Sequence, residues 1–390
     1  MKFISRTVIL LSVISFFNDI ASEMLYPVMP AFLKSISFSV LLIGILEGLA
    51  DATAGLSKGY FGKLSDDTGK RIPFIRYGYL FSALAKPMMA VLTFPVWIFS
   101  ARTFDKLGKG IRTSARDAML SDEATPQTKG KVFGFHRAFD TLGAVCGPLL
   151  ALLYLHFYPA NYKTMFLLAF APGILTVFLT FFIKDKEVRV AKERTKTSFT
   201  SFLHYWKDSS TAYKKLLIGL LLFALFNSSD MFLLLKFKEV AHDDSAVIKA
   251  YIFYNIIYAL ASFPLGALGD KLSLKTVFII GLGIFSLVYM GMAFSENIYL
   301  CYGLFFLYGI FSAATEGISK AWITNVSDKK DTATAIGTYT AFQSICTMLA
   351  SFIAGYIWWA TNGATVTFLL TATVTLGVMV YFSFLKKQTD

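Results

Sequence analysis

Long apolar runs separated by short polar segments recur along the whole chain. Each run is roughly 20 residues long, which is the length that an α-helix needs to cross the hydrocarbon layer of a bilayer. The apolar residues are continuous within a run, which favours helices over the alternating strands of a closed barrel. We predict twelve such helices, near residues 8–33, 41–62, 74–94, 95–113, 131–156, 163–183, 215–237, 246–268, 275–294, 298–320, 334–358 and 364–385.

The composition agrees with an integral membrane protein. Of the 390 residues, 55% are hydrophobic and only 16% are charged, whereas a water-soluble domain of this length needs more polar surface. Lys2 and Arg6 before an apolar segment would also suit a signal peptide, but apolar character resumes at Met24, so we expect an uncleaved first helix. The cysteines have no disulfide or metal-ligand spacing, and the sequence predicts no metal and no cofactor; they are Cys146, Cys301 and Cys346.

The formal net charge of +12 is distributed along the chain in a way that predicts orientation. Basic residues gather in alternate loops, and by the positive-inside rule both termini then lie in the cytoplasm. The charge is explained without a nucleic-acid partner. The residues concerned are Lys63, Lys70, Arg71 and Arg76, then Arg112, Arg116, Lys129 and Lys131 in the loop expected between the fourth and fifth helices, then Lys271, Lys275, Lys320, Lys329, Lys330, Lys386 and Lys387.

A polar linker, residues 184–214, divides the chain into two halves of six helices each, residues 1–183 and 215–390. The halves echo each other. "GKLSDDTGKR", which begins at Gly62, is followed about two hundred residues later by "GALGDKLSLK", which begins at Gly266. A duplicated six-helix unit in parallel orientation is one of the repeat architectures of secondary transporters.

The segment after the second predicted helix resembles the signature loop of the major facilitator superfamily. The second copy matches it less fully, because Ser273 replaces a glycine, and in the first copy Asp67 stands where the family usually has Arg or Lys. The resemblance extends over the whole chain. The matching residues, which we expect to form a gating loop, are Gly62, Asp66, Gly69, Lys70 and Arg71, with Gly266 and Asp270 in the second copy.

This resemblance implies an all-α membrane protein of twelve transmembrane helices in two pseudo-symmetric six-helix bundles, with the substrate site between them. Small Gly62 would let two helices approach closely. Asp66 would cap a neighbouring helix N-terminus or pair with a basic residue of the loops. Such contacts would hold the cytoplasmic side in one state, and breaking them would open it.

The fifth predicted helix carries "GFHRAFDTLGAVCGPLL". Its spacing resembles the motif that the superfamily's antiporters and drug exporters share, although Ala151 and Leu152 replace the closing glycine pair. The physical role would be a smooth, kinkable face at the interface of the two halves. Ordinary close packing of helices is the alternative. The residues of the motif are Gly134, Gly143, Gly147 and Pro148.

Acidic residues lie inside the apolar runs of the first half, where each costs at least about 2.5–3.5 kcal/mol on insertion scales. Some will pair with Lys86, Arg102 or Lys106 and lock helices together. The acids outnumber these bases, so one of them is expected to share a proton or meet a cation. We predict a proton-coupling and substrate group, with Asp19 first by depth, consisting of Asn18, Asp19, Glu23, Glu47, Asp51, Arg102 and Asp105; His136, Arg137 and Asp140 lie nearer the cytoplasm.

The second half has a less charged interior. Aromatic and amide residues at helical spacing suit the lining of a cavity for an organic solute, although tyrosines are also common as packing and belt residues. The predicted lining consists of Tyr251, Tyr254, Asn255, Tyr258, Asp230 and Gln343.

The sequence therefore predicts a secondary transporter that moves a small organic solute by alternating access, coupled to protons and exporting. The alternatives are an importer of an anionic solute gripped by Arg102, Lys106 or Arg137, and a transporter of lipid. A membrane-embedded enzyme is disfavoured, because the chain has no HExxH motif and no sizeable segment outside the predicted helices, and the lack of a phosphate-binding loop gives no indication of ATP as the energy source. We expect a monomer in the bacterial inner membrane whose partners are a small-molecule substrate, protons and the lipid bilayer.

Overall fold

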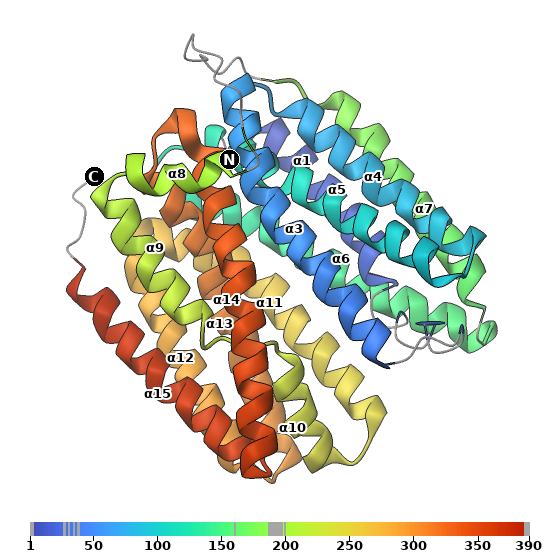
Figure 1. Ribbon diagram of the computed structural model, residues 1–390. Coiled ribbons are helices and arrows are strands. Elements are labelled where there is room, and N and C mark those ends of the chain that lie inside the picture. Colours follow the sequence, from blue (N-terminus) through green and yellow to red (C-terminus); the bar gives the residue numbers. More distant parts are fainter. Residues whose placement is uncertain are drawn as a thin grey trace. The chain divides into compact units, whose positions relative to one another are not determined.

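A computed structural model describes residues 4–25, 29, 32–33, 36, 40–159, 161–185, 198 and 200–385, without the side chains of 40–45, 47–49, 51 and 244–245. The described residues form helices and connecting turns (Figure 1). The helices of the first half are α1 (Arg6–Glu23), α3 (Val40–Thr68), α4 (Ile72–Val91), α5 (Pro95–Asp122), α6 (Lys129–Phe157) and α7 (Tyr162–Leu179), which continues as the 3-10 helix η2 (Thr180–Phe182).

The linker and the second half follow the same pattern. The linker contributes α8 (Ser201–Asp208), which packs Phe202 against Gly59 of α3. The remaining helices are α9 (Thr211–Ala224), α10 (Met231–Ala241), α11 (Asp244–Leu272), α12 (Leu274–Phe294), α13 (Ile298–Val326), the 3-10 helix η3 (Lys329–Asp331), α14 (Thr332–Thr361) and α15 (Ala364–Phe384).

Within the described residues, seven helices are long and apolar enough to cross a membrane by length and composition alone. In the first half, α1, α4 and α5 carry more polar and charged residues than this composition allows. The seven are α6, α7 with η2, α11, α12, α13, α14 with η3, and α15.

Several predicted helices differ in their bounds from those in the structure; the first was expected to reach residue 33, but α1 ends at Glu23. The fourth was expected to end at residue 113, but α5 continues to Asp122, and residues 111–121 are all buried. Arg112 and Arg116 therefore lie inside a helix, and the loop predicted for them is wrong. Their polarity concealed the helix, because a buried polar face satisfied by side-chain partners has no hydropathy signal.

The seventh predicted helix, residues 215–237, is interrupted. The first part, α9, ends at Ala224, and the second part, α10, begins at Met231. The connecting segment contains "NSSD", residues 227–230. Short side chains of this kind compete with the helix for backbone hydrogen bonds, which accounts for the interruption where hydropathy indicated continuity.

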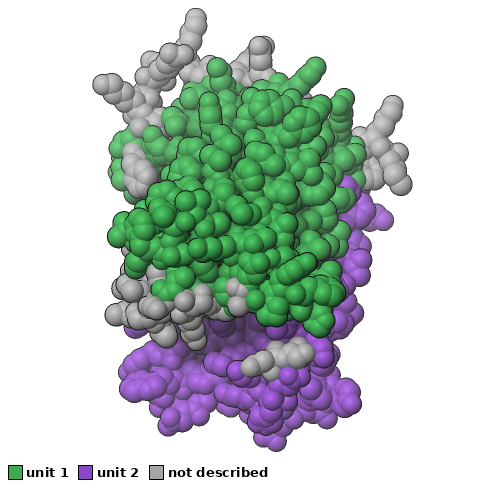
Figure 2. Space-filling view, turned by 90° about the vertical axis from the view of Figure 1, so that its right-hand side faces the viewer, with its two compact units in different colours: residues 1–123, 139–208, 327–341 green, residues 124–138, 209–326, 342–390 purple. Residues whose placement is uncertain are grey.

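The chain divides into two compact units, and neither is contiguous in sequence (Figure 2). Unit 1 consists of residues 1–123, 139–208 and 327–341, and unit 2 of residues 124–138, 209–326 and 342–390. Each unit therefore includes the first turns of one helix from the other half of the sequence: α14 enters unit 1 and α6 enters unit 2. The predicted boundaries at 183 and 215 stay a prediction.

In unit 1, α4 and α5 cross closely at two glycines. A Cβ atom added to Gly108 of α5 would lie 2.6 Å from the main-chain oxygen of Gly78 in α4 and 2.9 Å from Ser82 N. No side chain fits there, so the two backbones lie in direct contact. In unit 2, α11 and α12 pack on α13, and α15 packs on α12.

The Gly108 crossing predicts a stability difference between two glycine substitutions. Gly108→Val should lower the unfolding free energy by about 1–3 kcal/mol through overpacking. Gly377→Val in α15 is the matched control, because nothing lies within 4 Å of a Cβ atom added there. Thermal unfolding of both purified variants in detergent measures this, and equal melting temperatures would contradict the packing argument.

Candidate functional site

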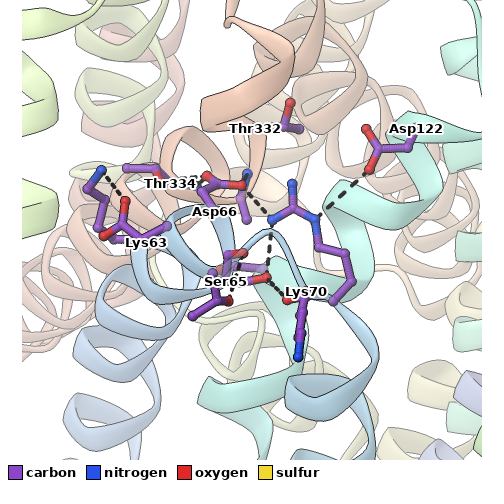
Figure 3. Close-up of polar contacts among 12 residues, drawn as sticks. Lys63, Ser65, Asp66, Lys70, Asp122, Thr332 and Thr334 are labelled. Atoms are coloured by element: carbon purple, nitrogen blue, oxygen red, sulfur yellow. Dashed lines mark hydrogen bonds and ion pairs between the residues drawn. The ribbon is translucent and has the colours of Figure 1, made fainter. Parts of the chain in front are cut away.

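A buried carboxylate at the end of α3 caps the N-terminus of α14 (Figure 3). Asp66 accepts hydrogen bonds from the backbone N–H groups of Ala333 (3.4 Å) and Thr334 (2.6 Å) and from the Thr334 hydroxyl (2.6 Å). These N–H groups have no partner inside their own helix, and the positive end of the helix dipole favours a negative charge there. Asp66 was predicted to cap a neighbouring helix, and this contact fits that prediction.

Gly62 allows this contact, because a Cβ atom added to it would lie 2.4 Å from the main-chain oxygen of Ala333. Gly62 and Asp66 were expected in a loop, but both lie on the last turns of α3. The helix ends at Thr68 and is followed by Gly69, whose φ of 66° is the left-handed conformation that glycine adopts readily.

Arg71 holds the Asp66 carboxylate in place and is itself 1% exposed. Its Nη1 atom lies 2.5 Å from Asp66 Oδ1 and 3.1 Å from Ser65 Oγ, and its Nε atom lies 4.0 Å from Asp122 Oδ2. Figure 3 shows Asp122 facing this guanidinium group and Lys70 pointing away from it. Asp67 forms a partly exposed pair with Lys63 at 2.7 Å, one turn earlier on α3. The contacts of Asp66 with Arg71 and with α14 are hereafter called the first latch.

The second copy of the loop repeats the cap in unit 2. Asp270 accepts hydrogen bonds from the backbone N–H groups of Gly130 (2.7 Å) and Lys131 (2.9 Å) at the start of α6. A Cβ atom added to Gly266 would lie 2.2 Å from the main-chain oxygen of Gly130. Lys129 also donates to the main-chain oxygen of Thr324 at the end of α13, at 2.6 Å. We call the contacts of Asp270 with α6 the second latch.

The two latches differ in their basic residue. Lys275, which the resemblance aligned with the first loop, donates to the main-chain oxygens of Ser383, at 2.9 Å, and Leu385 near the end of α15. Ser273 caps α12 by accepting from Thr276 N at 3.1 Å. Asp270 therefore lacks the buried arginine that Arg71 supplies to Asp66.

An acid–base cluster lies on α4 and α5 in unit 1. The Lys86 ammonium group, 1% exposed, lies 3.0 Å from Asp105 Oδ1 and 3.2 Å from Ser22 Oγ. The Arg102 guanidinium group lies 3.6 Å from Asp105 Oδ2. Two bases thus neutralise Asp105. This agrees with the expectation that some of the acids pair with Lys86 or Arg102 and lock helices together.

A second cluster contains residues that the sequence had placed in a loop. Arg116 of α5 forms a pair with Asp117 at 3.0 Å and donates to Ser15 Oγ of α1 at 2.9 Å. Ser15 donates in turn to Asp140 Oδ1 of α6 at 2.5 Å, and Arg116 Nη1 lies 3.7 Å from the same oxygen. Arg116 therefore joins α1, α5 and α6.

Asp19 of α1 lies beside this second cluster. It is half-buried, accepts a hydrogen bond from Asn18 Nδ2 at 3.0 Å, and lies near the negative charges of Asp140 and Glu23. Glu23 is also half-buried and is surrounded by the positive charges of α5, Lys109 first among them. The side chains of Glu47 and Asp51 lie outside the described residues.

The predicted lining residues of the second half are largely packed. Tyr254, Asn255 and Tyr258 are buried, and Tyr251 and Gln343 are half-buried. The hydroxyl of Tyr254 donates to Asp230, and its ring lies 5.4 Å from that of Tyr251. Asn255 donates to the main-chain oxygen of Tyr251 at 2.9 Å.

The glycine motif of α6 serves two different contacts. A Cβ atom added to Gly143 would lie 2.5 Å from the main-chain oxygen of Phe16, and one added to Gly147 would lie 2.7 Å from Met24 N, so this part of α6, with Pro148, follows α1 in unit 1. Gly134 faces α11 in unit 2, because a Cβ atom added to it would lie 2.4 Å from the main-chain oxygen of Ser262. The predicted contact with the other half of the sequence therefore occurs at Gly134.

Two further observations concern the partner of Arg137 and possible metal ligands. Arg137 of α6 forms an ion pair with Glu316 of α13 in unit 2. Among the described residues, no group of three or more His, Cys, Asp or Glu side chains could hold a metal ion.

Comparison with known proteins points to one family. The family model of the Major Facilitator Superfamily matches residues 11–257 and 242–390. The chain is 34% identical to an uncharacterised MFS-type transporter of Methanocaldococcus jannaschii, over 91% of this chain and 89% of that protein. It is 22% identical to a multi-drug resistance efflux pump PmrA homolog of Lactococcus lactis, over 88% of this chain and 86% of that protein.

Solved structures agree on the fold. The outward-conformation crystal structure of FucP, the fucose:proton symporter of E. coli, superposes with a TM-score of 0.81 and 12% identity over 100% of both chains. The human organic anion transporter MFSD10 superposes with a TM-score of 0.80 and 15% identity, over 97% of this chain and 99% of that one.

The first latch predicts that substitution of Asp66 has a large effect and substitution of its neighbour Asp67 has little or none. Asp66→Asn removes one member of a buried ion pair, which typically costs about 3–5 kcal/mol, whereas Asp67→Asn removes a partly exposed pair that contributes about 0–1 kcal/mol. Ser114, which is 0% exposed and donates to the main-chain oxygen of Lys58 on α3, reports on this region. With Ser114→Cys in a background without the native cysteines, Asp66→Asn should accelerate maleimide labelling and Asp67→Asn should not; equal labelling of both would contradict the latch.

Proposed function

The chain belongs to the major facilitator superfamily, and from this membership we propose that it is a proton-coupled secondary transporter that exports a small organic solute by alternating access. It is an integral, multi-pass membrane protein whose family transports small molecules across the bilayer. The proton, the direction of transport and the residues that couple them are the parts of this proposal that need their own support.

The observation that carries the proposal is the pair of carboxyl groups on α1 and α6. Asp19 and Asp140 lie close enough for their charges to interact, and we propose that they share a hydrogen bond. A hydrogen bond between two carboxyl groups requires a proton, because ionised carboxylates only accept. When that proton leaves, two negative charges face each other at short range and repel. Protonation therefore changes how strongly α1 and α6 attract each other.

The position of Asp140 relates this proton to the rest of the molecule. Helix α6 belongs to unit 2 up to Ala138 and to unit 1 from Phe139 onward. Asp140 thus lies directly after the point where α6 passes from one unit to the other. Arg116 and Ser15 hold the Asp140 carboxyl group in place. A change in the protonation of Asp140 therefore alters its interaction with Asp19 and the contact between α6 and α1.

The two latches supply a gate for this cycle. Both lie where the first turns of a helix from one half of the sequence meet the other half. We propose that they hold the cytoplasmic ends together in one state and release in the other. Because the interactions are hydrogen bonds to helix N-termini, they can break and re-form without rearranging either helix.

Export is supported by the glycine pattern of α6 and by the similarity to an efflux pump. Import of an anion gripped by arginine is less well supported, because Arg102 is engaged by Asp105 and Arg137 by Glu316. Nothing in the described residues favours transport of lipid. We further propose a monomer in the bacterial inner membrane with both termini in the cytoplasm.

The carboxyl pair predicts a loss of coupling in two variants. In proteoliposomes with an imposed pH gradient and ethidium as the transported probe, Asp19→Asn and Asp140→Asn should each abolish the dependence of transport on the gradient. The reason is that an amide can neither take up nor release the shared proton. Transport without a gradient should persist.

Asp67→Asn is the control, because it removes a carboxylate that pairs with Lys63 away from the pair. Full gradient dependence in both pair variants would refute proton coupling at this site. If ethidium is not transported by the unchanged protein, a growth comparison across a panel of antimicrobial compounds identifies the probe for the same assay.

A further inference from the structure

The break between α9 and α10 in unit 2 leaves backbone groups without partners. Leu225 N bonds to the main-chain oxygen of Leu221, and Asn227 N bonds to that of Phe223. Within the described residues, no donor bonds to the main-chain oxygens of residues 224–228. Unsatisfied carbonyl groups at membrane depth are tolerated where they line water or an ion.

Side-chain oxygens of the same segment are also unsatisfied. Asn227 Oδ1 and Ser228 Oγ are buried and have no hydrogen-bond partner among the described residues. The Ser228 side chain is 4% exposed, and it faces the hydroxyl of Tyr289, a fully buried residue whose oxygen is likewise unsatisfied. Each of these three oxygen atoms leaves a desolvation cost that a ligand would remove.

The carboxylate at the end of the break is arranged for a negative charge. The backbone N–H of Met231 donates to Ser229 Oγ (3.3 Å), which leaves the serine proton free to donate to Asp230 Oδ1 (3.4 Å). Tyr254 donates to the other carboxylate oxygen. These donors stabilise the ionised form, whereas burial and the nearby charge of Glu316 oppose it.

This negative charge has no basic partner in the described part of unit 2. No ion pair of Asp230 is present there, and the arginine on the neighbouring α6, Arg137, is paired with Glu316. Asp230 is half-buried, and a charge partly removed from water without a counter-charge is costly. A positive ion is therefore the group that the break lacks.

We propose that the break between α9 and α10 binds a sodium ion, coordinated by the Asp230 carboxylate, by Asn227 Oδ1, Ser228 Oγ and the Tyr289 hydroxyl, and by main-chain oxygens of residues 224–228. Oxygen atoms are the donors that hard cations prefer. One carboxylate balances a single positive charge and leaves a divalent ion under-compensated. Interrupted transmembrane helices bind ions in this way in other transporter folds.

An organic cation does not fit this place. The rings around the break pack on one another, with Phe223 5.1 Å from Phe285 and Tyr254 5.3 Å from Tyr308 between centroids. The sodium site lies in unit 2 and does not depend on the proton pair of unit 1, so either proposal can fail alone.

Sodium should stabilise the purified protein specifically, because an ion that binds only the folded state raises its melting temperature. We expect a saturable rise with NaCl, at constant ionic strength, that KCl and choline chloride do not give. Asp230→Asn and Ser228→Ala should each raise the half-saturating sodium concentration by about tenfold or more. Asp230→Asn should also melt higher than the unchanged protein in sodium-free medium, because its uncompensated charge is gone.

Two variants serve as controls and should keep the sodium response. Ser286→Ala removes another buried serine of unit 2, whose hydroxyl donates to the main-chain oxygen of Ala372. Asp19→Asn removes the proton-pair carboxylate of unit 1. Binding of radioactive sodium to Ser228→Ala and to the unchanged protein gives the same comparison if Asp230→Asn does not fold. Equal effects of sodium and potassium, or an unchanged half-saturating concentration in Asp230→Asn or Ser228→Ala, would overturn the proposal.

Discussion

The structure depends on a carboxylate placed at the N-terminus of a helix from the other half of the sequence. Asp66 does this for α14, and Asp270 does it for α6. A helix N-terminus presents N–H groups that no residue of its own helix can satisfy, and in a membrane protein water cannot always replace the missing partner. The composition of the two units follows, because each includes the first turns of the helix that its aspartate caps.

The two latches are built alike but are not equal. In the first, Arg71 is buried against Asp66 and reaches toward Asp122, so three charged side chains and one helix end depend on each other. In the second, the equivalent basic residue secures α15, and Asp270 accepts from the backbone N–H groups of Gly130 and Lys131. Removal of one member of a buried ion pair costs more than removal of a single cap. The first latch is therefore the stronger of the two, and we infer that it releases last.

Much of the fold was readable from the sequence, because hydropathy and the repeated loop report on features with a strong local signal. The helices that carry few charges, such as α12 and α15, begin and end within a residue or two of their predicted positions. Gly62 and Asp66 were recognisable from their spacing, although the end of α3 was placed one to two turns too early. The last part of α5, residues 114–122, was missed, because a helix buried through paired polar residues such as Arg116 and Asp117 has the composition of a loop.

The candidate site was less predictable, because its partners come from distant segments. Asp19 was singled out by depth, but its neighbour Asp140 was treated as a residue of the cytoplasmic end, and only the packing of α6 on α1 at Gly143 brings the two together. The sequence "NSSD" lies in the helix break at residues 225–230. The break was not predicted, because the mean hydropathy of the surrounding residues is still that of a continuous transmembrane helix. A polar cluster of short side chains in an apolar run predicts an interruption when it is read for backbone competition.

The most direct test of the latches is a pair of distances measured by pulsed electron paramagnetic resonance. Thr68 and Lys330 are exposed positions beside the first latch, and Gln127 and Lys271 are exposed positions beside the second. Spin labels on either pair should give one short distance in the unchanged protein. In the double variant Asp66→Asn with Asp270→Asn, both pairs should gain a population at longer distance. Unchanged distance distributions in the double variant would contradict the account.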